Sequence, residues 1–150
     1  MRRRIRQNKE KEMNTRQIEL VQASFEKVRP VAAQAAETFY ERLFEIAPHV
    51  RHMFKNDMKK QGAMLMSTLG LAVGSLNKLE TIMPAIEKLG RSHAGYGVTP
   101  EHYQPVAEAF LWTLDHYLGA EFTAEVKEAW VEAYMTLAGA MITASEAVPA

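Results

Sequence analysis

The sequence predicts a single all-α domain, and three observations support that prediction. Apolar residues recur at three- and four-residue spacing along most of the chain, as they do on one face of a helix. No segment alternates apolar and polar residues over the length of a strand, and no hairpin signal appears. With 150 residues and 47% hydrophobic content, the chain suffices for one domain with a sizeable core.

Two helices are expected ahead of Pro48. Asn14 or Thr15 caps the first, because a short polar side chain accepts a hydrogen bond from the free N–H groups of a first turn. The second follows Pro30. Each places its apolar residues on one face: Ile18, Val21, Phe25 and Val28 in the first, and Ala36, Phe39, Tyr40, Leu43 and Ala47 in the second.

A short helical element is expected to begin at Pro48, since proline suits a first helical turn. The polar link KNDMKK, residues 55–60, separates it from a longer helix. That helix presents one face made of Gln61, Leu65, Leu69, Ala72 and Leu76.

The next helix is expected to end with an inward histidine. Gly95 and Gly97 follow and break the helix. Helical steps of three and four residues place His93 on the same apolar stripe as Ile82, Ile86 and Leu89.

Two further helices complete the domain. Thr99 caps the first, Pro100 takes its first position and Gly119 ends it, while Thr123 caps the last. Their apolar faces are Tyr103, Val106, Phe110, Leu114 and Tyr117, then Val126, Trp130, Ala133, Leu137 and Met141.

Charge is balanced over the whole chain, with 18 basic and 18 acidic side chains, but it is unevenly distributed. Residues 1–12 hold six basic and two acidic side chains, which leaves 12 basic and 16 acidic in the remainder. We expect a basic, flexible arm at 1–13, a domain at 14–146 and a disordered tail at 147–150. A net charge of zero provides no field for gathering nucleic acid or anionic membrane.

Several classes of protein are excluded by composition. The chain has no cysteine, which rules out disulfides, thiolate metal sites, iron–sulfur clusters, a cysteine nucleophile and covalent haem attachment of the c type. The arm lacks the apolar run of a signal peptide. The longest nearly apolar run, residues 63–76, is too short to span a bilayer. We expect a cytoplasmic protein with no membrane or nucleic-acid partner.

Three polar side chains interrupt the expected apolar faces: Tyr40, Gln61 and His93. Each has an ordinary explanation, because a lone core histidine, a half-buried tyrosine and a solvent-facing glutamine are all common. Three such residues on three helices nevertheless suggest a shared pocket. A neutral imidazole is a good iron ligand, and an apolar pocket with few polar groups can hold a large planar cofactor.

Four segments resemble the globin family, and most closely the globin domain of bacterial flavohaemoglobins and their single-domain relatives. They are FYERLFEIAPHVRHMF, QGAMLMSTLG, IMPAIEKLGRSHAGYGVTPEHY and EAWVEAYMTLA, in matching order and separation between about residues 15 and 144. The resemblance implies the globin fold, a three-over-three helical sandwich around haem b. It also implies a short or absent helix between the second and the distal helices.

The resemblance implies roles for individual residues. His93 corresponds to the proximal iron ligand, and Tyr40 and Gln61 to the distal pair that acts on the bound gas. Phe54 corresponds to the phenylalanine that packs on the haem face, and Gly62 to a small residue that lets its helix cross Ala36 closely. The remaining cofactor contacts are Leu65 above the ligand, Met64, Tyr96, Val98 and Tyr103.

The relatives also connect a tyrosine at the Tyr103 position to the proximal histidine and to a glutamate. Here the glutamate position falls on Ala147, next to Glu146, so an acidic partner for Tyr103 stays an open question.

The two distal donors, a phenol O–H and an amide NH₂, favour retention of oxygen over its delivery. The resemblance implies nitric oxide dioxygenation. The flavin and nicotinamide domains of flavohaemoglobins have no counterpart within the 150 residues, so we expect a separate reductase. The expected ligands are O₂, NO and CO. Two alternatives stay open: binding, storage or scavenging of oxygen, nitric oxide or sulfide without sustained turnover, and a haem-based gas sensor.

Overall fold

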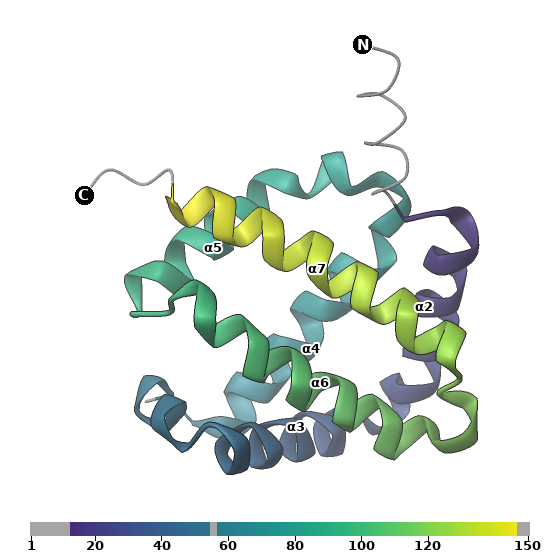
Figure 1. The fold of residues 1–150 in the computed structure, drawn as a ribbon, viewed down its shortest axis with the longest axis horizontal. Helices are drawn as coiled ribbons and strands as arrows, with labels where there is room; N and C mark the ends of the chain where they lie inside the picture. Colours follow the sequence, from purple (N-terminus) through teal and green to yellow (C-terminus); the bar gives the residue numbers. More distant parts are fainter. Residues whose placement is uncertain (1–12, 55–56, 147–150) are drawn as a thin grey trace.

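The computed structural model describes residues 13–54 and 57–146 as α-helices joined by short 3₁₀ segments (Figure 1). No strand occurs within these ranges, so the all-α prediction is confirmed. Residues 1–12 of the expected arm and the expected tail at 147–150 lie outside the described residues. Met13, which was assigned to the arm, instead packs against the core.

Over the described ranges, the six α-helices are α2 (Thr15–Val28), α3 (Ala32–Ile46), α4 (Met58–Gly74), α5 (Met83–Gly95), α6 (Tyr103–Leu118) and α7 (Ala124–Glu146). The 3₁₀ segments between them are η1 (Arg29–Val31), η2 (Pro48–Met53), η3 (Leu76–Thr81), η4 (Pro100–His102) and η5 (Gly119–Glu121). The element expected at Pro48 is therefore the short helix η2. None of the described helices combines the length and the apolar composition that a membrane span requires.

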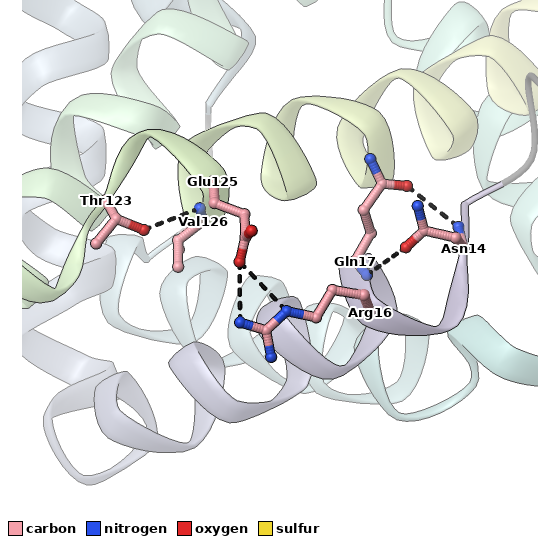
Figure 2. Close-up of polar contacts among 6 residues, drawn as sticks. All are labelled: Asn14, Arg16, Gln17, Thr123, Glu125 and Val126. Carbon is pink, nitrogen blue, oxygen red and sulfur yellow. Dashed lines mark hydrogen bonds and ion pairs between the residues drawn. The ribbon is translucent and has the colours of Figure 1, made fainter.

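Polar caps fix the starts of α2 and α7 as the sequence predicts (Figure 2). The Gln17 N–H donates to Asn14 Oδ1 at 2.7 Å, and the Asn14 N–H donates to Gln17 Oε1 at 3.1 Å. The two bonds form a capping box that satisfies two free donors of the first turn. At α7, the Val126 N–H donates to Thr123 Oγ1 at 3.2 Å.

The start of α4 corrects the sequence prediction. Residues 58–60, which were assigned to a polar link, already belong to the helix. Asp57 is its cap, and the Asp57 side chain accepts a hydrogen bond from the Lys59 N–H at 2.9 Å. Lys59 and Lys60 are exposed, and such a polar composition is also typical of a loop. An exposed first helical turn needs no apolar residue when a cap residue precedes it.

The larger core cluster lies where α2, α6 and α7 meet. Trp130 of α7 is its largest member, and the indole Nε1–H donates to Ser24 Oγ of α2 at 2.8 Å. The ring centroid of Trp130 lies 5.4 Å from that of Phe110 and 6.3 Å from that of Phe25. The buried indole therefore packs on two aromatic rings without an unsatisfied N–H group.

Helices α3 and α4 cross closely at one glycine. A Cβ atom added at Gly62 would lie 3.0 Å from the Cβ of Ala36, which is tighter than ordinary packing. The close crossing expected from the family resemblance is therefore present. It brings the distal face of α4 against the buried face of α3.

The α2 cap and a nearby ion pair allow a matched test of local stability. Asn14→Ala should lower the free energy of unfolding by about 0.5–2 kcal/mol, because it removes a helix cap. Arg16 donates to Glu125 Oε1 at 2.9 and 3.2 Å, but both side chains are mostly exposed (Figure 2). Arg16→Ala should cost only about 0–1 kcal/mol. Urea unfolding followed by circular dichroism measures both, and a larger loss for Arg16→Ala would contradict this ranking.

Candidate functional site

His93 lies in the last turn of α5 and is half-buried. Its Nδ1 lies 2.8 Å from the backbone oxygen of Leu89, four residues earlier. A carbonyl oxygen can only accept a hydrogen bond, so this contact assigns the proton to Nδ1. The Nε2 atom is then the one with a free lone pair. A neutral histidine that is oriented in this way can ligate a metal through Nε2.

The corner after α5 folds back onto His93. The Val98 N–H donates to the His93 carbonyl at 3.0 Å, and the Tyr96 N–H donates to the same oxygen at 3.1 Å. Gly97 has a φ of 92°, in the left-handed region where a glycine is favoured. The turn therefore places Val98, which is half-buried, beside the histidine.

Tyr40 of α3 is the polar group of an aromatic cluster and is only 6% exposed. Its ring centroid lies 5.0 Å from Phe39, 5.3 Å from Phe54 and 6.1 Å from Phe44. Burial raises the pKa of the Tyr40 phenol, and the neighbouring Gln61 side chain offsets part of that rise. The phenol therefore stays neutral at physiological pH and keeps an O–H that can donate.

Gln61 approaches Tyr40 from α4 and is half-buried. Its side chain lies close enough to Tyr40 to lower the pKa of the phenol. Leu65 lies one turn further along α4 and packs against the same aromatic cluster. Tyr40, Gln61 and Leu65, which the sequence predicts as one distal site, thus lie together.

Phe54 follows η2 and joins the cluster from a third element. Its ring centroid lies 5.4 Å from that of Phe44. Arg51, which the sequence analysis did not identify, places its guanidinium 4.9 Å from the centroid of Phe44. The same guanidinium donates to the Phe54 carbonyl at 3.4 Å. One exposed arginine therefore contacts the ring of Phe44 and the backbone of Phe54, two residues that flank Tyr40.

Tyr103 begins α6 and is half-buried, and burial raises the pKa of its phenol. Among the described residues, His93 makes its side-chain hydrogen bond with Leu89 and makes none with Tyr103. The contact of Tyr103 is instead with α7, where the Tyr134 hydroxyl donates to the Tyr103 carbonyl. Glu146 is exposed, and Ala147 lies outside the described residues.

Tyr134 is a residue that the sequence analysis missed. Burial raises the pKa of its phenol well above the ordinary value of 10.0, and the proximity of Tyr103 raises it further. The criterion that identified Tyr40, a polar tip on an apolar helix, also applies to Tyr134. It lies four residues after Trp130 on α7 and was overlooked beside that larger ring.

Two of the predicted cofactor contacts lie at the surface. Met64 is 65% exposed and Tyr96 is 75% exposed. Of the other four histidines, His49, His52 and His116 are exposed. His102 is half-buried, and its Nδ1 accepts from the Thr99 N–H at 2.9 Å.

Gln61 and His93 lie on two helices, α4 and α5, that have different packing partners. These helices do not pack closely on each other, since α4 packs on α3 whereas α5 packs on α7 (Figure 1). Two of the enclosed voids, of about 20 and 30 Å³, are too small for more than a water-sized group. Apolar side chains from four helices are only half-buried: Leu65 and Leu69 of α4, Leu89 of α5, Val106 and Phe110 of α6, and Leu137 and Met141 of α7.

The chain matches the globin family over residues 37–141. A flavohemoprotein of Bacillus subtilis (strain 168) is 30% identical over 137 residues, which cover 87% of this chain and 33% of that protein. A flavohemoprotein of Xylella fastidiosa (strain Temecula1) is 35% identical over 105 residues, covering 68% of this chain and 26% of that protein. The chain thus spans about a third of the length of the curated relatives that it matches.

One solved structure has the same fold. It is an engineered carbene transferase made from a Rhodothermus marinus protein that is provisionally named a nitric oxide dioxygenase. The TM-score is 0.82 at 28% sequence identity, and the alignment covers 89% of this chain and 94% of that chain.

Tyr134→Phe tests the proximal tyrosine pair through pH. At neutral pH it should lower the free energy of unfolding of the cofactor-free protein by about 0.5–1.5 kcal/mol, because one hydrogen bond is lost. The pKa of Tyr134 is higher in the folded protein than its ordinary value of 10.0, so above pH 10 the unfolded chain ionises first. The free energy of unfolding of the wild type therefore falls as pH rises above 10. The difference between wild type and variant should therefore shrink above pH 10, by up to about 1.4 kcal/mol per pH unit.

Urea unfolding on both sides of pH 10 measures that difference. Tyr96→Phe is the matched control, because this tyrosine is 75% exposed and should follow the wild type. If the difference in the free energy of unfolding between wild type and Tyr134→Phe stays constant above pH 10, the raised pKa of the Tyr134 phenol is contradicted.

Proposed function

The chain belongs to the globin family, and we propose that it binds haem b through His93 and retains oxygen beneath Tyr40 and Gln61 for reaction with nitric oxide. The haem iron would supply reversible oxygen binding and the conversion of nitric oxide to nitrate. The family membership implies haem binding, and the all-α globin fold expected from the sequence is confirmed. The observation that carries the proposal is the orientation of His93 by Leu89.

The proximal half of the proposal rests on that hydrogen bond. With a proton on Nδ1, the neutral tautomer of the imidazole has its lone pair on Nε2. A ring that is also held by a backbone carbonyl loses little rotational freedom when it binds a metal. Its half-buried position on α5 allows a planar cofactor to approach from the side of α4.

The distal half rests on Tyr40. Its phenol is neutral and buried, so the O–H is available to oxygen held in the pocket. An amide N–H of Gln61 that faces the phenol oxygen makes that O–H a better donor, because hydrogen bonds in a chain polarise one another. Tyr40 then acts as the direct donor, while Gln61 acts on oxygen mainly through Tyr40.

Retention of oxygen follows from charge. Tyr40 would donate to a bound gas whose outer atom draws negative charge from the haem iron, and a hydrogen bond to a charged acceptor contributes about 1.5–3 kcal/mol. One such bond slows dissociation by about one to two powers of ten. Slow release favours reaction with nitric oxide over delivery of oxygen to another site.

Sustained turnover needs electrons from a reductase. The matched region covers about a third of the flavohemoprotein of Bacillus subtilis. We propose a reductase as the electron-donating partner. Oxygen, nitric oxide or sulfide binding without turnover is the alternative use of the same pocket, and nitrate production with a supplied reductase distinguishes the two.

His93→Ala tests the proximal assignment. The purified variant should lose haem, or keep it only when imidazole is added, because the nitrogen ligand is missing. Optical spectra of the ferric, ferrous and CO-bound protein measure this loss. His49→Ala and His116→Ala are matched controls on exposed histidines and should keep the wild-type spectra. Full haem retention in His93→Ala, with an unchanged CO spectrum, would refute the assignment.

Tyr40→Phe and Gln61→Leu test the distal assignment. Tyr40→Phe should raise the oxygen dissociation rate by about one to two powers of ten, because it removes the direct donor. Gln61→Leu should have a smaller effect in the same direction, and the double variant should be close to Tyr40→Phe alone.

Stopped-flow measurement of oxygen release gives the three rates. The CO dissociation rate is the internal control and should change much less, since bound CO carries less charge on its outer atom. If Tyr40→Phe changes oxygen release by less than about twofold, the tyrosine is structural and the retention proposal fails.

A further inference from the structure

Helix α5 crosses α7 closely at Gly90. A Cβ atom added there would lie 2.3 Å from the Met141 carbonyl oxygen and 2.6 Å from the Met141 Cα atom of α7. These atoms belong to the backbone of α7, so no side-chain rotation can relieve the contact. The backbone of Gly90 therefore rests directly on the backbone of α7.

This contact fixes α5 from one side. The buried residues of α5 are Ile86 and Gly90, which lie four residues apart and share one face of the helix. The main packing partner of α5 is α7, and α4 is not packed closely against it. The position of α5 across the cofactor region is thus set by how deeply the Ile86 and Gly90 face enters α7.

Gly90 lies next to the residues that hold and carry the proposed iron ligand. Leu89, the residue directly before Gly90, provides the carbonyl that holds Nδ1 of His93 at 2.8 Å. His93 follows Gly90 by three residues and lies in the next turn of the same helix. Any displacement of Gly90 away from α7 therefore moves both the imidazole and the carbonyl that orients it.

We propose that Gly90 is a positioning residue for the proximal ligand: its contact with the Met141 backbone sets the depth of α5 and thereby the approach of His93 to iron. The proposal rests on His93 being that ligand. A methyl group at position 90 needs a C···O separation of about 3.3 Å, so α5 would move by roughly 1 Å. The ring of His93 would move with the helix.

Gly90→Ala and Gly95→Ala form a matched pair for the test. Both add one methyl group to α5, but a Cβ atom at Gly95 meets nothing within 4 Å, and Gly95 does not have a positive φ. Gly90→Ala should shift the iron–histidine stretching band in the resonance Raman spectrum of the ferrous protein. It should also release haem about tenfold faster, equivalent to about 1.4 kcal/mol. Gly95→Ala should leave both unchanged.

The position of the iron–histidine stretching band distinguishes a positioning role of Gly90 from a purely structural role. A purely structural glycine would change the unfolding midpoint of the cofactor-free protein without moving the band. A folded Gly90→Ala protein with the wild-type band position would overturn the proposal. If Gly90→Ala does not fold, the Ile86→Val variant provides the test. This substitution removes one methyl group from the same buried face of α5 and introduces no clash. A shifted band in Ile86→Val supports the proposal, and an unshifted band overturns it.

Failure of the proposed function gives a different result. If His93 is not the iron ligand, the stretching band persists or is absent equally in wild type and His93→Ala. If His93 is the ligand but Gly90 does not position it, the band disappears in His93→Ala and stays in place in Gly90→Ala.

Discussion

The hydrogen bond between His93 Nδ1 and the Leu89 carbonyl is the interaction on which the proximal side depends. It assigns the proton to one nitrogen, keeps the other available, and holds the ring relative to its own helix. Because the acceptor belongs to the backbone, the ring moves only as α5 moves. The position of α5 in turn follows from the contact between Gly90 and the backbone of α7. The hydrogen bond within α5 and the crossing of α5 with α7 thus both affect the position of the same imidazole.

The distal side is built in a different way, from packing. Tyr40 is held by aromatic rings from α3 and from the segment after η2, and not by a backbone anchor. The close crossing at Gly62 brings α4 against this cluster and Gln61 against the phenol. Burial keeps the phenol neutral, so it retains an O–H group that can donate a hydrogen bond. The Tyr40 hydroxyl, held in place by the surrounding rings, can donate one hydrogen bond to a charged acceptor.

Much of the fold could be predicted from the sequence because it depends on local chemistry. Asn14 and Thr123 form caps as expected, and the last turn of α5 carries a half-buried His93. The start of α4 was placed too late, because Asp57 is a cap whose first turn carries no apolar residue. That error is local, and it moved no predicted site residue away from its helix.

The remaining features depend on contacts between residues that are far apart in sequence. The need for glycine at position 90 follows from the carbonyl of Met141, some fifty residues later, and no local pattern reveals it. The bond from Tyr134 to the Tyr103 carbonyl also joins two helices. A family resemblance can transfer the role of Tyr103 by position. The hydrogen-bond partner that this chain provides for it is visible only in three dimensions.

The optical spectrum of the ferrous protein without added ligand tests the central claim most directly. A haem held by His93 alone, opposite a glutamine that does not ligate iron, should be five-coordinate and high-spin, and should bind CO rapidly. A six-coordinate, low-spin ferrous spectrum would mean that a second side chain reaches the iron. The open distal pocket beneath Tyr40 would then not exist.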